Sequence, residues 1–414
     1  MEEASCPVVL DLVGSDIHGE AARIRANGPV SKVELPGGVV AWSVTSHEVA
    51  RQVLTDQRFS KDPRKHYVDY QEGRIGEDFP LIGWVLMENL TTAYGPDHTR
   101  LRKPCAQAFT PRRVEALRAG VQSFANDLLD ELATVPPGEV VDLKSRFAHT
   151  LPSRVICDLF GVPEEDRLEM LRGGEANVDT SISPEEAAAN FEHWHQMMLD
   201  FVAAKRRDPA DDLTSDLVAA QEADGSRLTD DEIVGTLHIM LATGTEPVKN
   251  LIANAVVALL TKPDQLALVT SGQASWSDVL AETLRVHAPV AQLPFRYAVE
   301  DVEIGGVTIA KGDPILMHYA AVGRDPQVHG DTAAVFDITR PNTETLSFGA
   351  GIYRCIGQPL ALLEAEIALT GLFGRFPDLA LAVAPEELKP QGTFIMNGVD
   401  TLPVYLKTSG PAGA

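Results

Sequence analysis

The sequence is poor in cysteine and in basic residues, and each shortage excludes a class of protein. The four cysteines, Cys6, Cys105, Cys157 and Cys355, lie far apart and form no CxxC pair, which excludes a secreted disulfide framework and favours reduced thiols. Lys and Arg number 35 against 59 Asp and Glu, which gives a formal net charge of -24. That balance excludes non-specific binding to nucleic acid or to an anionic membrane surface.

The pattern indicates no targeting segment and no membrane span. The first residues, MEEASCPVVLDLVGSD, are acidic where a signal peptide needs positive charge, and Pro7 and Asp11 interrupt their apolar run. No segment has the roughly 20 apolar residues that a span requires. We therefore expect a soluble, cytoplasmic monomer with a single domain over residues 1–414, an N-terminal extension over residues 1–20 and a flexible tail over residues 408–414.

Apolar residues recur mainly at helical spacing, with a smaller β part. Residues 31–44 around Pro36-Gly37-Gly38, and residues 299–317 around Gly305-Gly306, each predict a β-hairpin. Apolar residues three and four apart predict helices at 111–132, 184–207, 229–260, 276–287 and 359–376. The pattern therefore predicts a mainly α fold with small β-sheets.

Residues 229–260 form the longest of these predicted helices. Thr229 and Glu232 make a capping box at its start. A length of about 30 residues is far above the usual 11 to 12, so an apolar helix of this length must cross the middle of the domain. Pro247 in its interior predicts a local break, because proline removes one hydrogen bond and costs about 3 kcal/mol.

The stretch LSFGAGIYRCIGQPLALLEAEIAL surrounds one cysteine with glycines. Gly349, Gly351 and Gly357 make the backbone around Cys355 permissive, and the helix predicted from Pro359 follows at once. Free N–H groups at a helix start lower the pKa of a nearby thiol, so Cys355 is suited to be a thiolate ligand of iron.

Three other interpretations of this loop are weaker. A nucleotide-binding glycine loop fails because Arg354 stands where the third glycine belongs. A nucleophilic cysteine needs a nearby positioned histidine, and the local neighbours are Tyr353 and Arg354. A merely buried thiol is the better interpretation for the other three cysteines, but the glycine spacing argues against it at Cys355.

The segment FGAGIYRCIG resembles the haem-binding signature of the cytochromes P-450, Phe-Gly-x-Gly-x-x-x-Cys-x-Gly. Phe348, Gly349, Gly351, Cys355 and Gly357 fill every fixed position. The resemblance covers nearly the whole chain and is nearest to the soluble bacterial branch. It implies a single large triangular domain, mainly α with small β-sheets, that encloses haem b with the thiolate of Cys355 as axial ligand.

Further residues match the family's pattern around this signature. The resemblance implies a structural Glu-x-x-Arg motif at Glu282 and Arg285 with Arg340 as its downstream partner. The pair alone would be an ordinary i,i+3 helix pair. The residues that the resemblance places at the two haem propionates are His98, Arg102, Arg296 and Tyr353. Tyr353 stands where the family commonly has His or Arg, so its contact with a propionate is the least certain of the four.

The resemblance places the oxygen-activation site in the long helix. The family's Ala-Gly-x-Glu/Asp-Thr is matched by Thr243, Gly244, Thr245, Glu246 and Pro247. The family's threonine helps to deliver protons to dioxygen, and proline has neither a hydroxyl nor an N–H. Thr243 lies one turn before Pro247 and is the better substitute than Thr245, although it is equally suited to bond a carbonyl of its own helix. Glu246 is expected to remain the acid.

The resemblance implies an oxidoreductase that hydroxylates or epoxidises a hydrophobic, aromatic or peptide-like natural product of secondary metabolism. Pro247 also favours an alternative, namely oxidative carbon–carbon or carbon–nitrogen coupling or cyclisation of aromatic or cyclic-dipeptide-like substrates without oxygen insertion. A third hypothesis from another class is a non-catalytic haem-binding sensor. The residues expected to line the substrate pocket are Trp84, Leu86, Met87, Ile239, Ala242, Val290, Leu293, Phe394 and Ile395.

Electrons must come from separate proteins, because no flavin or nicotinamide fingerprint is present in the chain. The resemblance implies a ferredoxin and a ferredoxin reductase. The basic residues predicted to dock an acidic ferredoxin are Arg100, Lys103, Arg112, Arg113 and Arg354. The competing interpretation is a set of solvated helix charges.

Overall fold

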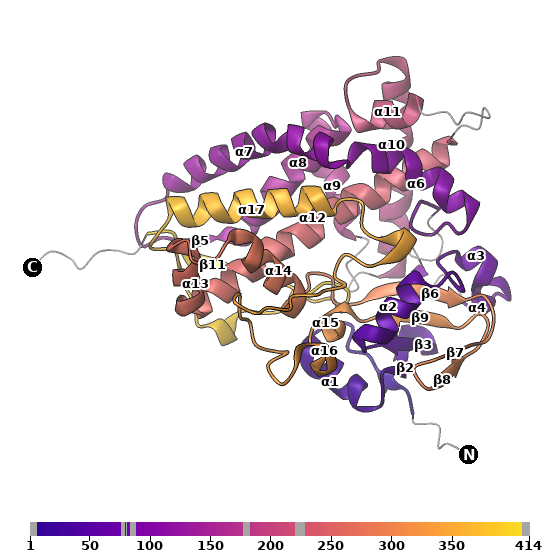
Figure 1. Cartoon of the computed structure of the whole chain (residues 1–414). Coiled ribbons are helices and arrows are strands. Elements are labelled where there is room, and N and C mark those ends of the chain that lie inside the picture. The colour runs from indigo at the N-terminus through magenta and orange to yellow at the C-terminus, as the bar shows by residue number, and fades with distance from the viewer. Residues whose placement is uncertain are drawn as a thin grey trace, which may run out of the picture.

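The computed structural model describes residues 6–75, 79, 81–82, 88–176, 183–219 and 228–407 (Figure 1). The helices are α1 Ile17–Ala26, α2 His47–Thr55, α3 Pro63–His66, α4 Val68–Gln71, α6 Pro96–Ala108, α7 Pro111–Ala133, α8 Thr150–Phe160, α9 Arg167–Ala176, α10 Pro184–Arg207, α11 Leu213–Ala219, α12 Asp230–Thr261, α13 Pro263–Thr270, α14 Trp276–Val286, α15 Tyr319–Val322, α16 Pro326–His329 and α17 Gln358–Arg375. The strands are β1 Val8–Val9, β2 Val30–Leu35, β3 Val39–Val44, β4 Phe59–Ser60, β5 Val140–Asp142, β6 Leu293–Ala298, β7 Val302–Ile304, β8 Val307–Ile309, β9 Pro314–Met317, β10 Ala380–Leu381 and β11 Pro403–Tyr405. This mainly α architecture with small sheets confirms the predicted fold class.

The largest sheet has the order β1-β2-β3-β9-β6-β4. Both predicted hairpins are confirmed, since β2 pairs antiparallel with β3 and β7 pairs antiparallel with β8. Gly305 and Gly306 turn the second hairpin with φ of 59° and 83°, values that favour glycine. The strand β9 follows this hairpin in the chain and lies in the large sheet, where it pairs with β3 on one side and with β6 on the other.

The segment before β2 carries one strand and one helix. Val8 and Val9 pair in parallel with β2, and Asp16 caps α1 by accepting a hydrogen bond from the N–H of Gly19. Most of residues 6–20 is therefore part of the fold, because the sheet edge and the helix give this segment backbone partners. The tail 408–414 lies outside the described residues.

The helix α12 confirms the predicted long central helix. It has 32 residues, and its capping box joins Thr229 and Glu232 as expected. It packs against α8, α9, α10, α14 and α17, so it crosses the helical part of the molecule. Pro247 lies inside it without ending it, as the helix predicted over residues 229–260 requires. The packing around both halves holds the helix together at the cost of one backbone hydrogen bond.

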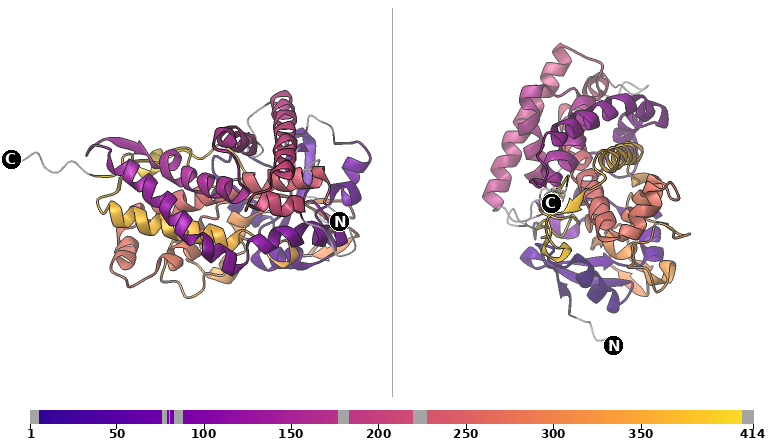
Figure 2. Two further views of the ribbon diagram at one scale, coloured as in Figure 1. Left: turned by 90° about the horizontal axis from the view of Figure 1, so that it is seen from above. Right: turned by 90° about the vertical axis from the view of Figure 1, so that its left-hand side faces the viewer.

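The molecule has a helical region and a β-rich region. The right-hand view of Figure 2 shows the first strands below the helices, and Figure 1 shows β2, β3, β6 and β9 together at the end that carries the N-terminus. The largest apolar core joins α7, α8, α12, α14 and α17. In the described part of the chain, no single helix is long and apolar enough to cross a membrane, although the bent pair Asp230–Leu260 and Pro263–Thr270 passes by length and composition.

Candidate active site

A cavity lies between the two regions, and α12 forms one wall of it. The loop around Cys355 forms the opposite wall, and β6, α6 and the start of α17 complete the lining. The lining residues include Lys61, Arg102, Ile239, Met240, Thr243, Gly244, Pro247, Val248, Val290, Leu293, Phe295, Arg296, Phe348, Gly349, Tyr353, Cys355, Gly357 and Glu364. Most residues predicted from the glycine-cysteine loop and the long helix therefore face one cavity.

The backbone of the loop presents the Cys355 thiol to this cavity. The N–H of Cys355 donates to the carbonyl of Phe348 at 2.9 Å, and Gly349 and Gly351 both have φ of 70°. A Cβ on Gly351 would lie 2.6 Å from the carbonyl oxygen of Leu54, so only glycine fits there. The two glycines are therefore required by a positive φ and a close backbone approach.

The pKa of the Cys355 thiol is raised in the structure, whereas the sequence predicted that it would be lowered. Burial raises the pKa of this thiol, although backbone N–H groups of Gly357 and Gln358 and the cations Arg102 and Arg354 act in the opposite direction. The helix start is thus placed as predicted, but desolvation outweighs it in the protein alone. A bound metal ion reverses this balance, because it deprotonates a coordinating thiol outright.

The structural motif behind the loop forms a buried network. Glu282 and Arg285 are fully buried and joined by two hydrogen bonds of 2.7 Å. Nη1 of Arg285 donates to the carbonyl of Gly323 at 2.9 Å, and Nη2, which also bonds Glu282, donates to the carbonyl of Val335 at 2.9 Å. Arg340 reaches Glu282 at 3.4 Å. The network ties α14 to the segments on both sides of it, as the structural role expected for these residues requires.

Of the remaining residues predicted at the propionates, Arg102 and Arg296 line the cavity, and His98 packs against the lining residue Tyr353. Arg296 is buried, and its one hydrogen bond, to the carbonyl of Phe59, is long at 3.5 Å. Arg102 lines the cavity and donates to the carbonyl of Arg354. His98 is not a cation, because burial lowers its pKa to about 4, and its Nε2 has no hydrogen-bond partner among the residues that the structure describes. It can therefore offer a neutral hydrogen bond in place of a charge.

The hydroxyl of Tyr353 does not make the propionate contact that the resemblance implied for it. Its hydroxyl donates to the carbonyl of Ala93 at 2.6 Å. The centroid of its ring lies 4.2 Å from the ring centroid of His98. The same centroid lies 5.0 Å from the guanidinium carbon of Arg296. Tyr353 thus positions His98 and Arg296, and its proton is not available to a propionate.

These residues fit a haem. Cys355 faces the cavity as a single sulfur ligand, and Nε2 of His98 and the guanidinium of Arg296 are buried polar groups whose bonding capacity is unfilled. Such groups are costly unless a partner satisfies them. The two propionates of haem b are partners of the right charge.

The predicted oxygen-activation residues divide between the cavity and the protein interior. Thr243, Gly244 and Pro247 line the cavity. The hydroxyl of Thr243 donates to the carbonyl of Ile239 at 2.6 Å, so this threonine bonds its own helix. Thr245 does the same with Leu241 at 2.7 Å and is buried behind the cavity wall.

Glu246 is turned away from the cavity. It is buried, forms an ion pair with Lys249 and accepts a hydrogen bond from Nε2 of Gln391 at 2.9 Å. Burial alone would raise its pKa, but Lys249 and Gln391 together lower it. Glu246 is therefore held ionised in a second network, which does not match its expected use as the acid at the oxygen site.

The sequence analysis missed an acid that does face the cavity. Glu364 on α17 is buried, its Oε2 has no hydrogen-bond partner among the described residues, and burial raises its pKa to about 8. The sequence carried a signal, since Glu364 shares an apolar helix face with Leu360 and Ile367. Lys61, which also lines the cavity, was missed as well.

The residues predicted to line the substrate pocket lie in three different places. Ile239, Val290 and Leu293 line the cavity. Ala242, Phe394 and Ile395 are buried in the core and are not among the described residues that line it. Trp84, Leu86 and Met87 lie outside the described residues.

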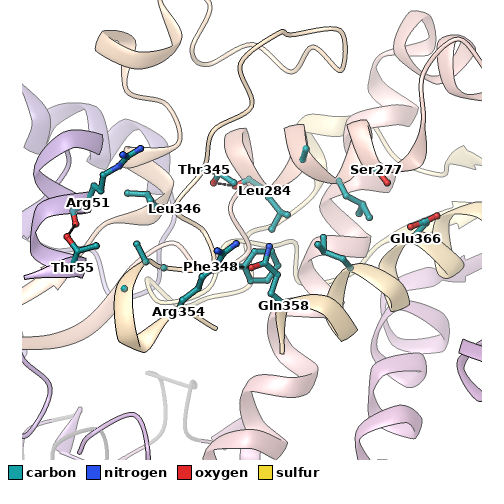
Figure 3. A pocket seen from close by; sticks show the side chains of 16 residues that line it. Arg51, Thr55, Ser277, Leu284, Thr345, Leu346, Phe348, Arg354, Gln358 and Glu366 are labelled. Atoms are coloured by element: carbon teal, nitrogen blue, oxygen red, sulfur yellow. Dashed lines mark hydrogen bonds between the residues drawn. The ribbon is translucent and has the colours of Figure 1, made fainter. Parts of the chain in front are cut away.

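A separate groove on the other side of the Cys355 loop bears on electron delivery. Figure 3 shows Arg51 and Arg354 beside Leu346 and Phe348, with Gln358 and Glu366 on α17. Of the predicted docking cations only Arg354 lines this groove.

The other four docking cations belong to α6 and α7. Arg100 pairs with Glu232 and Arg113 with Asp216 at 3.2 Å, so two of the predicted cations are partly neutralised. Arg112 is exposed at the start of α7.

Comparison with known proteins identifies the family. The profile described as Cytochrome P450 matches residues 277–397. The 2-hydroxy-5-methyl-1-naphthoate 7-hydroxylase of Streptomyces carzinostaticus is 50% identical over 402 residues, covering 97% of this chain and 98% of that protein. The structure of CYP154C4 from Streptomyces sp. W2061 superposes with a TM-score of 0.94 at 41% identity, covering 98% of this chain and 100% of that one. The enzyme CxnD for C-S bond formation in chuangxinmycin biosynthesis gives a TM-score of 0.88 at 32% identity, covering 99% of this chain and 100% of that one. The chain therefore belongs to the cytochrome P450 family and is a monooxygenase.

Proposed function

We propose that this protein hydroxylates a fused-ring aromatic carboxylate of secondary metabolism, with haem b bound through Cys355. The observation that carries the substrate class is the 50% identity, over 97% of the chain, to the naphthoate hydroxylase. The cavity supports it, because its lining is mainly apolar and includes the cations Lys61, Arg102 and Arg296. A planar acid can therefore pack against one part and have its charge near the other.

The residues around the cavity have separable tasks. Ile239, Met240 and Val248 of α12 face Val290 and Leu293 across the cavity, and these apolar walls exclude water and orient a flat ring. The residues that would hold the haem are Cys355, His98, Arg102 and Arg296. A bound haem supplies the iron at which dioxygen is activated.

Glu364 is the group that we infer holds a proton for this reaction. Its carboxyl is protonated at neutral pH because its pKa is about 8, and its Oε2 is free of other partners in the described structure. Glu246 is kept ionised by Lys249, and the Thr243 hydroxyl is bonded to Ile239. Glu364 follows Cys355 on α17 and is thus a protonated group at the Cys355 side of the cavity, whereas Pro247 belongs to the α12 side.

A second candidate reaction is oxidative bond formation within or between aromatic substrates. Two observations favour it: Pro247 removes the hydroxyl next to the cavity, and CxnD, an enzyme for C-S bond formation, shares the fold at 32% identity. In this reaction the substrate loses hydrogen atoms and no oxygen is inserted.

Turnover under ¹⁸O-labelled dioxygen distinguishes the two reactions. The holoenzyme is supplied with surrogate ferredoxin and reductase and with a set of naphthoates, and products are read by mass. Incorporation of one labelled oxygen atom is the result expected. Products that have lost two hydrogens, or unlabelled dimers, would establish the second candidate instead.

The electron donors are proposed to be a ferredoxin and its reductase. The groove beside Cys355 carries Arg51 and Arg354, and Arg112 is exposed on α7. An acidic ferredoxin can approach such cations even though the chain is acidic overall, because attraction at short range depends on local charge.

A further inference from the structure

Lys61 directly follows β4, at the cationic edge of the cavity. In the antiparallel pair of β4 and β6, Phe59 lies opposite Ala298 and Ser60 lies opposite Tyr297. Continuing this register by one residue places Lys61 opposite Arg296, and both side chains line the cavity. Residues directly opposite each other point to the same face, where like charges are destabilising.

Protein carboxylates do not relieve this repulsion. Glu364 is the one acid among the described residues that line the cavity, and it belongs to α17. Asp62, the neighbour of Lys61, accepts hydrogen bonds of 3.1 Å from the backbone N–H and Nε of Arg64 and pairs with Lys65 at 3.4 Å.

The surroundings of Lys61 and of Arg296 lower the pKa of both side chains. Burial, and secondarily the charge of Arg296, lowers the pKa of Lys61 to about 7. Burial likewise lowers the pKa of Arg296. Lys61 is half-buried and Arg296 is buried. Two neighbouring cations with so little water around them, and with no ionised carboxylate in the described lining, are costly to the fold unless a ligand supplies the counter-charge.

We propose that Lys61 and Arg296 together bind one carboxylate group of a molecule that occupies the cavity. A carboxylate has two oxygens and can accept a charge-assisted hydrogen bond from each side chain. Its negative charge replaces the repulsion across the β4–β6 pair with two attractions. The proposal rests on the proposed function, which supplies two such groups: a haem propionate and the carboxylate of an aromatic substrate.

The test replaces Lys61 by Met, which keeps the length of the side chain and removes its charge. Lys311→Met is the matched control, because Lys311 is exposed in the turn before β9 and the same charge is lost. Lys61→Arg should retain binding, which separates loss of the cation from loss of packing. All variants are compared as holoenzymes with the same reduced carbon monoxide spectrum.

The first arm measures haem transfer to excess apomyoglobin. If Lys61 and Arg296 hold a haem propionate, Lys61→Met loses haem about tenfold faster or more, while Lys311→Met and Lys61→Arg match the wild type. The second arm titrates 1-naphthoate and 1-naphthamide by the change in the haem absorption. If Lys61 and Arg296 hold the carboxylate of the substrate, the rate of haem transfer is unchanged. Lys61→Met then loses the preference for 1-naphthoate over 1-naphthamide.

The proposal is overturned if Lys61→Met matches Lys311→Met in both arms. A failure of the proposed function is recognised separately, because the wild-type holoenzyme would then give no ¹⁸O-labelled product from any naphthoate, whatever the variants do in the two arms.

Discussion

At the scale of single residues, burial decides what each charged group does. Glu246 and Glu364 are both buried carboxylates near the cavity, yet Lys249 and Gln391 lower the pKa of the first and burial raises the pKa of the second. A paired carboxylate is locked as an anion, whereas an unpaired one keeps its proton. The chemistry at the cavity therefore depends on which of the two faces it.

Glu364 should make the stability of the protein depend on pH. Its pKa is raised from 4.5 to about 8 in the folded state, so the folded protein holds one more proton than the unfolded chain between these values, and stability falls as pH rises through the window. Glu364→Gln removes this cost. The variant should equal the wild type below pH 4.5 and gain up to about 5 kcal/mol by pH 8, measured by urea unfolding.

Glu366→Gln is the control for this comparison. Glu366 lies two residues along α17 and borders the groove shown in Figure 3 instead of the cavity. A pH dependence that both glutamine variants share would contradict the assignment to Glu364.

Pro247 can be tested with two substitutions that differ by one hydroxyl. Both Pro247→Ala and Pro247→Thr restore the N–H that α12 lacks, so each should raise stability by up to about 3 kcal/mol. Only threonine also places a hydroxyl at the cavity, so we expect Pro247→Thr to yield more hydroxylated product per electron consumed than Pro247→Ala. Equal yields from the two variants would show that this hydroxyl is irrelevant to proton supply here.

At the scale of elements, the Cys355 loop depends on contacts from segments distant in sequence. Arg285 of α14 bonds carbonyls at residues 323 and 335, and the hydroxyl of Ser347 donates to the carbonyl of Leu284 at 2.5 Å. The loop is thus held against α14 by polar contacts, while α12 and α17 close it from the other sides through the apolar core.

Breaking the buried pair should cost far more than breaking a surface pair of the same spacing. Glu282→Gln leaves the buried charge of Arg285 without its counter-ion. This should lower the free energy of unfolding by roughly 3 to 5 kcal/mol. Glu115→Gln breaks the exposed i,i+3 pair with Arg118 on α7 and should leave the free energy of unfolding nearly unchanged. Urea unfolding gives both values, and the thiolate signature in the carbon monoxide spectrum should diminish only for Glu282→Gln.

At the scale of the whole molecule, a strongly acidic chain must still receive electrons at one face. The net charge of -24 repels an acidic ferredoxin at long range, whereas local cations near the Cys355 side attract it within about 10 Å at 0.1 M salt. The docking rate is therefore expected to depend steeply on ionic strength.

Arg112 and Arg113 provide the test of this arrangement. Replacing both by Gln should slow reduction by ferredoxin several-fold or more at low salt, and the difference should shrink as salt is added. Replacing Arg23 and Lys32, of α1 and β2 at the β-rich end in Figure 1, removes the same charge from another surface. Unchanged stopped-flow kinetics for Arg112 and Arg113, or equal effects of both pairs, would rule out docking at this site.

The sequence by itself determined the features that are local or periodic. The glycine spacing around Cys355, the Glu282-x-x-Arg285 motif, the capping box at Thr229 and the helical period each depend on residues a few positions apart, so the mainly α fold and the family followed from them. Only the tertiary structure decided where Glu246 points, that the Tyr353 hydroxyl is bound to Ala93, and that Lys61 and Arg296 line one cavity. These facts depend on contacts between distant segments and on desolvation, which arise only when the chain is packed.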